Sequence, residues 1–423
     1  MAGRLVAPAR NRYLRARYQL LGGLLVAIVL PVVVRSLDGT WVFGIPATQN
    51  TVTAALVAHV FGFFAFRRMG SFPGVAAAGY ILPTFALSYG LVFAVIFFYR
   101  IDYSRFQAGG SFLLSTLWYF GWSIATRRVV RHSLAIIPGG DVSGIDRIQN
   151  VVWHHLSSPD QTVKGISGIV ADLRADLSDA WERYIADAAL AGIPVYHVKQ
   201  VIESLTGRAE IEQLSENTLG SLNPNQIYLS FKEIADRVAA LVVLVLLAPL
   251  LAVIALAIRL DSPGPAFFRQ QRMGFRGKVF TVYKFRSMRV EPVATDARES
   301  AMTRAQDARI TRVGRFLRFT RLDELPQALN ILRGEMSWIG PRPEALALSR
   351  WYEAELPFYR YRHIVRPGIT GWAQVSQGHV TEVGDVREKL HYDFYYIKNF
   401  SPWLDFLIVL RTIRVIVTGH GAR

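Results

Sequence analysis

The chain has 423 residues, of which 51% are hydrophobic, with a net charge of +16 and a mean hydropathy of +0.24. These values predict a membrane protein with a basic cytoplasmic surface. The absence of cysteine excludes disulfides, thiolate metal sites and cysteine nucleophiles. The basic residues are spread among the membrane segments, so no nucleic-acid partner is expected. Part of the charge excess suits anionic lipid or phosphate ligands instead.

Four apolar stretches occupy the first third of the chain. They are Tyr18–Val34, Thr51–Phe66, Pro73–Phe98 and Ser111–Ala125. Arginines before the first stretch, between the second and third and after the fourth predict a four-helix membrane unit with both ends in the cytoplasm, over residues 1–130. The first stretch is read as an uncleaved span. We expect no ionisable group deep within these spans, and hence an anchor or dimerisation unit rather than a proton path or a transporter.

Residues 131–228 predict a small soluble α/β domain with parallel strands. The expected strands are Leu134–Ile137, Gly165–Leu173 and Ile193–Val198, and the expected helix is Ser178–Ala191. Gly139-Gly140 follows the first strand. This turn is compatible with a phosphate cradle and with an ordinary strand-to-helix turn, and its spacing favours the second.

A fifth apolar stretch, Leu241–Ile258, has basic residues on both sides and Pro249 near its centre. Proline breaks the hydrogen-bond ladder of a helix. Both facts predict a bent, re-entrant helix over about residues 236–259, with a complete span as the alternative. The remainder, residues 262–423, is polar and basic, and Trp403–Val417 predicts a helix lying in the membrane interface. The re-entrant segment and this remainder together form the third predicted domain, residues 229–423.

Asp323 and Glu324 are adjacent carboxylates in a region crowded with arginines. The neighbouring arginines are Arg312, Arg315, Arg318, Arg321, Arg333 and Arg342. We expect both acids to be favoured as anions there, suited to act on phosphates as nucleophile or metal ligand. Acidic residues are also common at helix N-termini for structural reasons.

Further cations and one further acid lie in rigid or strand-like segments. Lys284 and Arg286 are two apart after a strand-like run, which predicts either a diphosphate grip or a solvated edge. Arg342 and Arg366 are held in Pro–Gly turns, which suits bidentate phosphate binding. Asp393 lies among aromatic residues.

Four motifs in order resemble the bacterial sugar transferases, the monotopic phosphoglycosyl transferases that start glycan assembly on polyprenyl phosphate. They are Lys284–Met288, Leu322–Pro343, Arg366–Val375 and Asp393–Asn399. The layout resembles the larger members, which place a four-helix membrane unit and a Rossmann-like domain before an α+β catalytic domain with a re-entrant helix. That family often has Ser-Pro at the helix break, where this chain has Ala248-Pro249.

The resemblance implies a reaction and a set of site residues. Asp323 matches the nucleophile that attacks the β-phosphate of a UDP-sugar, releasing UMP, and Glu324 matches its partner acid; both are implied ligands of Mg²⁺. The implied substrate-binding residues are Lys284, Arg286, Arg318, Arg342, Arg366 and Asp393. The acceptor would be undecaprenyl phosphate.

We therefore expect an enzyme of the bacterial inner membrane, with its catalytic domain on the cytoplasmic face, that transfers galactose- or glucose-1-phosphate and begins exopolysaccharide, capsule or O-antigen synthesis. The sequence does not distinguish the two sugars. A homodimer is favoured by the layout alone. The rival interpretation is a catalytically silent scaffold of a polysaccharide assembly complex, against which the intact Asp323-Glu324 pair argues.

Overall fold

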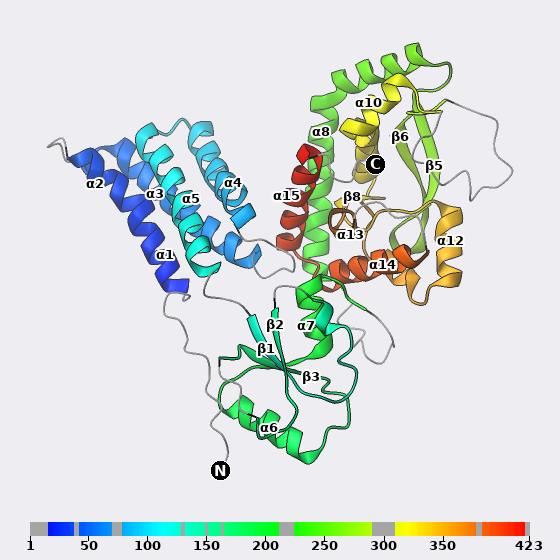
Figure 1. Cartoon of the computed structure of the whole chain (residues 1–423). Coiled ribbons are helices and arrows are strands. Elements are labelled where there is room, and N and C mark those ends of the chain that lie inside the picture. The colour runs from blue at the N-terminus through cyan, green and yellow to red at the C-terminus, as the bar shows by residue number, and fades with distance from the viewer. Residues whose placement is uncertain are drawn as a thin grey trace. The chain divides into compact units, whose positions relative to one another are not determined.

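The computed structural model describes residues 16–37, 42–69, 78–127, 132–148, 151–161, 165–210, 224–289, 309–377 and 383–418. The chain divides into two compact units, residues 1–207 and 208–423, whose elements are labelled in Figure 1. The predicted domain boundaries after residues 130 and 228 stay predictions. The start of the predicted stretch Pro73–Phe98 lies outside the described residues.

The first unit begins with apolar helices. They are α1 (Ala16–Leu24), the π-helical turn η2 (Leu25–Val29), α2 (Leu30–Ser36), the 3₁₀ turn η3 (Val42–Gly44), α3 (Pro46–Met69), α4 (Ala78–Phe98) and α5 (Arg105–Arg127). Within the described residues, Ala16–Ser36, Pro46–Met69 and Gly79–Phe98 are long and apolar enough to cross a membrane. The predicted fourth span is a helix, α5, but it does not meet that standard.

Helix α5 is less apolar because it carries polar side chains on its buried face. Ser115 Oγ lies 2.8 Å from His59 Nδ1 of α3 and 2.8 Å from the Tyr89 hydroxyl of α4. His59 is fully buried, and its Nε2 lies 3.4 Å from the Tyr119 hydroxyl. The expectation of no ionisable group deep within these helices is therefore wrong. The imidazole is held by hydrogen bonds between helices, which stabilise association in an apolar medium.

The rest of the first unit is a sheet with helices, and its predicted parallel α/β character is confirmed. The sheet order is β2-β1-β3-β4 and every pairing is parallel. Its elements are β1 (His132–Ile136), the 3₁₀ turn η4 (Ile145–Arg147), β2 (Val151–His155), β3 (Gly168–Ala171), α6 (Asp179–Leu190), β4 (Val195–His197) and α7 (Val198–Thr206). Strand β2 was not expected, because two histidines interrupt its apolar pattern.

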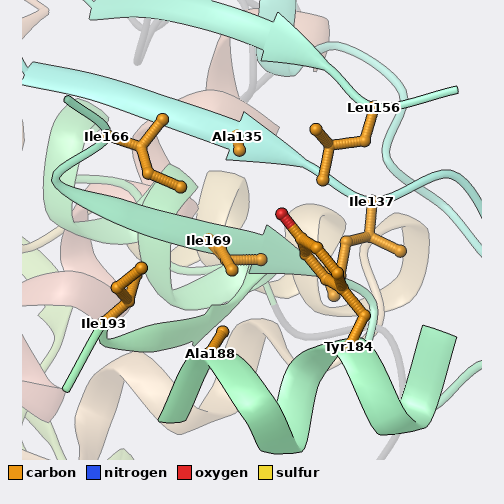
Figure 2. Close-up of a cluster of buried hydrophobic side chains, with 9 residues drawn as sticks. Ala135, Ile137, Leu156, Ile166, Ile169, Tyr184, Ala188 and Ile193 are labelled. Atoms are coloured by element: carbon orange, nitrogen blue, oxygen red, sulfur yellow. The ribbon is translucent and has the colours of Figure 1, made fainter. Parts of the chain in front are cut away.

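Alternate residues of these strands feed two separate cores. Ala135 and Ile169 join a cluster with Tyr184 and Ala188 of α6, as Figure 2 shows. Leu134 and Val170 join a second cluster with Val198 and Val201 of α7. Successive side chains of a strand point to opposite faces, so α6 and α7 cover opposite faces of the sheet.

The Gly139-Gly140 turn follows β1, and both glycines have positive φ, at 128° and 65°. A Cβ on Gly140 would lie 2.4 Å from Asp172 Oδ2, so only glycine fits there. The amide of Asp141 donates to the same Asp172 carboxylate at 3.0 Å. The turn is thus already occupied by a carboxylate of the chain, which favours the ordinary turn over a phosphate cradle.

The second unit surrounds a hairpin of β5 and β6 with short helices. Its elements are α8 (Gln226–Asp261), β5 (Phe267–Met273), the 3₁₀ turn η6 (Phe275–Gly277), β6 (Val279–Phe285), α10 (Arg312–Thr320), the 3₁₀ helix η7 (Leu322–Gln327), α11 (Ala328–Leu332), β7 (Ser337–Ile339), α12 (Leu346–Glu355), the 3₁₀ helix η8 (Tyr359–Ile364), β8 (Gly368–Thr370), α13 (Trp372–Ser376), α14 (Val383–Lys398) and α15 (Pro402–Thr418). Strands β5 and β6 are antiparallel, and β7 and β8 are parallel.

Helix α8 contains the predicted re-entrant segment and, at 36 residues, is the longest of the four described helices that are apolar enough to cross a membrane. Figure 1 shows that it rises as one rod and then turns sideways. Pro249 is the one proline in the helix. Because proline lacks the N–H that would pair with the carbonyl four residues earlier, it accounts for the bend.

Both ends of α8 are attached to the second unit. Near its start, Lys232 Nζ lies 2.8 Å from Asp405 Oδ2 of α15, and Ser337 of β7 donates to Asp236 at 2.6 Å. At its end, the Arg286 guanidinium donates to the carbonyls of Ser262 and Pro263, at 2.6 and 2.7 Å.

Between these attachments α8 touches two cores of the unit. Ala240 packs with Phe280 and Val282 of β6, whereas Ile254 and Ile258 pack with Phe285 at the end of the same strand. One face of α8 therefore packs on the unit both before and after Pro249.

Candidate active site

The two candidate carboxylates lie in η7, directly after Arg321, which has a left-handed backbone with φ of 61°. That conformation ends α10 and turns the chain into a new short helix. Pro326 is accommodated within this 3₁₀ turn. Asp323 and Glu324 are both buried, at 9% and 6% exposure. They are therefore buried inside the unit and are not exposed acids at a helix N-terminus.

Glu324 is held by two cations from different parts of the chain. Its Oε1 lies 2.7 Å from Lys284 Nζ of β6 and 2.9 Å from Arg342 Nη2, in the turn after β7. Burial opposes ionisation, but Arg342 and Lys284 outweigh it and hold the pKa of Glu324 well below its usual range. The expectation that this acid is a stable anion is therefore confirmed.

Asp323 behaves differently. Burial, and secondarily the charge of Glu324, raise its pKa above the usual range, although Lys284, Arg318 and Arg342 oppose the shift. The expectation that both acids are favoured as anions is wrong for Asp323, because the neighbouring cations pair with Glu324 and leave Asp323 buried. The two adjacent acids therefore differ in their surroundings: Glu324 is paired with cations, and Asp323 is buried beside it.

Lys284 is buried on the same cluster. Burial lowers its pKa to about 8, and the opposing effect of Glu324 only partly restores it. Arg318 donates to Ser287 Oγ at 2.9 Å and is close enough to act on Asp323. The structure therefore brings together five of the predicted site residues: Lys284, Arg318, Asp323, Glu324 and Arg342.

Three predicted site residues lie outside this cluster. Arg286 binds the last carbonyls of α8, so it does not share a face with Lys284. Arg366 lies 2.8 Å from Glu233 of α8, donates to the Gly334 carbonyl at 2.9 Å and stacks on the Phe275 ring. Asp393 of α14 accepts from Arg362 at 2.8 Å. Their substrate-binding roles stay predictions.

Sequence reasoning missed two arginines beside the site. Buried Arg362 of η8 pairs with Asp393, and half-buried Arg272 of β5 donates to the Pro343 carbonyl. In the hairpin register Arg272 faces Phe280 and Phe268 faces Lys284, so Arg272 and Lys284 point to one face. That register, unknown from the sequence, is the signal that would have found it.

The donor set can be compared with the ligands that Mg²⁺ prefers. Within the described residues no group of three or more His, Asp and Glu side chains could hold a metal ion. Mg²⁺ in phosphate-handling sites commonly binds through one or two carboxylates, substrate phosphates and water. The adjacent Asp323 and Glu324 carboxylates fit that pattern. The described residues do not offer enough ligands for a site made of protein groups alone.

Comparison with known proteins identifies the family. The family model described as bacterial sugar transferase matches residues 227–419. An N-acetylgalactosaminephosphotransferase of Aeromonas hydrophila, named for UDP-N-acetylgalactosamine and undecaprenyl phosphate, is 43% identical over 95% of this chain and 94% of its own. The UDP-glucose:undecaprenyl-phosphate glucose-1-phosphate transferase of Escherichia coli is 44% identical over 43% of this chain and 39% of its own.

A shorter relative matches less than half of this chain. The exopolysaccharide production protein PSS of Rhizobium leguminosarum is 43% identical over 190 residues, which are 44% of this chain and 94% of that protein. The matched segment of the family model contains every residue of the carboxylate cluster. Together with the near full-length relative, these matches show that the chain belongs to the bacterial sugar transferase family, a family of enzymes.

Proposed function

We propose that this protein transfers a sugar-1-phosphate from a UDP-sugar to undecaprenyl phosphate and releases UMP, as the first membrane step of a polysaccharide pathway. One observation carries the proposal. A buried carboxylate, Asp323, lies beside an ion-paired partner, Glu324, in the unit to which both ends of an apolar helix are attached. The names of the relatives support the same reaction class.

The proposed chemistry has two displacement steps. An oxygen of the Asp323 carboxylate attacks the β-phosphorus of the UDP-sugar, and the bond to the UMP oxygen breaks. The phosphosugar is then an acyl phosphate on Asp323. A phosphate oxygen of the lipid attacks the same phosphorus, which frees Asp323 and yields undecaprenyl diphosphate sugar.

The side chains around Asp323 suit those steps. Arg342 and Lys284 are fixed by Glu324 and lie where they would offset charge on the diphosphate. Arg318 adds a third cation near Asp323. A Mg²⁺ ion held by Asp323 and Glu324 together with the diphosphate would neutralise charge on the leaving UMP.

We base the proposed membrane placement of the catalytic unit on helix α8. Its two ends bind the same unit through Asp236 and Arg286, and its middle carries the exposed apolar side chains Val245, Leu246 and Val253. A helix tied at both ends to one folded unit favours re-entry into one leaflet over a complete span. We place the catalytic unit on the cytoplasmic face of the inner membrane, where UDP-sugars are made. A Rossmann-like fold of the α/β domain and a homodimeric state remain part of this proposal.

The donor sugar is proposed from the relatives. The near full-length one is named for UDP-N-acetylgalactosamine and a partial one for UDP-glucose. We therefore add UDP-N-acetylgalactosamine to the galactose and glucose donors expected from the sequence, and rank it first because its match covers both units.

The deciding experiment measures UMP release by detergent-solubilised protein with undecaprenyl phosphate, Mg²⁺ and a panel of UDP-sugars. We expect one donor to be turned over and Asp323→Asn to abolish both UMP release and a covalent phosphosugar adduct. Glu388→Gln, which changes a half-exposed ion pair on α14, is the matched control and should behave as wild type. Turnover by Asp323→Asn at the wild-type rate would refute the nucleophile assignment.

A further inference from the structure

The turn that carries Arg342, residues 340–344, is fixed along its whole backbone. Pro341 and Pro343 have no N–H and donate no backbone hydrogen bond. Four successive carbonyls of the turn instead accept hydrogen bonds from three other segments, β5, η8 and β8. Pro341 accepts from Gly368 N at 2.9 Å, Arg342 from Arg362 Nη2 at 2.9 Å, Pro343 from Arg272 Nη1, and Glu344 from Met273 N at 3.2 Å.

Two of those four donors are guanidinium groups, and Arg362, which is the more deeply buried, is also the more firmly anchored. Its Nε and Nη2 both donate to Asp393 Oδ2, at 3.1 and 2.8 Å, and its Nη1 donates to the Tyr359 hydroxyl at 2.7 Å. The remaining direction of Nη2 points to the Arg342 carbonyl. Arg362 thus links α14 to the backbone of the residue whose side chain holds Glu324.

Asp393 itself is closed off from solvent. It is 1% exposed, and its partner Arg362 is 3% exposed. An acid buried in this way has no open side from which to touch a sugar or a phosphate. Its one described polar partner is Arg362, and the carboxylate supplies the charge that keeps that guanidinium in place.

We propose that Asp393 and Arg362 are positioning residues that aim Arg342: Asp393 fixes Arg362, and Arg362 fixes the Arg342 carbonyl, so that the Arg342 guanidinium stays on Glu324 beside Asp323. This inference rests on the proposed function, in which Asp323 is the nucleophile beside Arg342. It replaces a substrate-binding role for Asp393 by an indirect one.

A double-mutant cycle tests the kinetic side. Asp393→Asn keeps the shape and removes the charge, and we expect kcat for UMP release to fall about 10- to 100-fold. The KM for the UDP-sugar should stay within about twofold, since no substrate contact is lost. In an Arg342→Lys background the same change should have little further effect, because both substitutions disable one device.

Three kinetic results would each overturn the proposal. Two of them are expected of a direct substrate contact: a changed preference of Asp393→Asn among the UDP-sugars, and an effect of Asp393→Asn that multiplies with the effect of Arg342→Lys. The third is turnover by Asp393→Asn at the wild-type rate. Glu388→Gln, on the same helix α14 and in a half-exposed pair with Arg208, is the control.

A second measurement needs no activity. Hydrogen exchange of the intact protein should show faster exchange in peptides covering residues 336–345 and 366–371 in Asp393→Asn, and no change in Glu388→Gln. Unaltered exchange there would overturn the positioning role even in an active enzyme. Wild-type protein that released no UMP with any donor would refute the proposed function instead, while the exchange result would still decide this inference.

Discussion

Asp323 and Glu324 are neighbours in the chain, yet their surroundings give them different chemistry. Glu324 takes both nearby cations on one oxygen, at 2.7 and 2.9 Å, and its pKa is depressed. Asp323 is buried beside that charge, and its pKa is raised. In the proposed mechanism, the paired acid orients the cations and the less paired acid is the nucleophile.

This difference predicts opposite effects on stability. The pKa of folded Glu324 lies below its unfolded value, so its contribution is present at neutral pH and is lost as pH falls through the folded pKa. Glu324→Gln leaves Lys284 and Arg342 buried without an anion and should cost roughly 3–5 kcal/mol. The raised pKa of Asp323 has the reverse sign, since its ionised form costs stability at neutral pH. Asp323→Asn should leave the melting temperature unchanged or higher.

Thermal unfolding of the two variants and wild type, in one detergent at pH 7.5, checks this pair. The result that contradicts it is a loss of melting temperature in Asp323→Asn as large as in Glu324→Gln. Glu388→Gln again serves as control, because its partner Arg208 is half exposed and such pairs contribute little.

Lys284 predicts an alkaline limit to activity. Burial lowers its pKa to about 8, so its charge is present below that pH and is lost above it. We expect UMP release to decline as pH rises through about 8. Lys284→Arg should move that decline to higher pH, because guanidinium keeps its proton. A pH–rate profile of the variant that overlays the wild type would assign the decline to another group.

The sequence identified the reactive pair and three of its cations but not the residues behind them. Asp323, Glu324 and Arg342 stand in a short run that carries its own signal. Arg272 and Arg362 carry none, because an isolated arginine in a basic chain looks like a solvated one until the fold buries it. Arg286 illustrates the converse error: its spacing from Lys284 suggested a shared face, but the strand ends at Phe285.

At the scale of elements, the hydrophobic pattern predicted helix or strand correctly where that pattern was strong. The helices at Ser178–Ala191 and Trp403–Val417 and three strands of the parallel sheet were predicted, and the structure contains them. Strand β2 was missed because its half-exposed, histidine-containing pattern is weak. His59 was overlooked within an apolar run, where only the bundle shows that it faces Ser115 rather than lipid.

Helix α8 carries a prediction that distinguishes re-entry from a complete span. Because the chain has no cysteine, single cysteines can be placed at Ile227 and Leu260, which are 85% and 79% exposed near its two ends. In a re-entrant helix, an impermeant maleimide should label both from the cytoplasmic side of membrane vesicles. A cysteine at Glu388 marks that side. Labelling of Leu260→Cys only from the opposite side would refute re-entry.

At the scale of the whole molecule, the division into two units argues that transfer belongs to the second alone. The carboxylate cluster, the attachments of α8 and the buried Arg362–Asp393 pair are all formed within residues 208–423. The match that covers 94% of the Rhizobium relative spans only 190 residues. More than half of this chain therefore has no counterpart in that match.

We accordingly expect the fragment 208–423, solubilised in detergent, to fold and to release UMP with kcat/KM within about tenfold of the full chain, because a domain with its own core and boundaries folds independently. The same fragment with Asp323→Asn sets the background. Hydrogen exchange tests whether the fragment is folded. A folded fragment that releases no more UMP than this background would show that the first unit completes the site. In that case the buried polar cluster around His59 becomes the first place to look for the missing contribution.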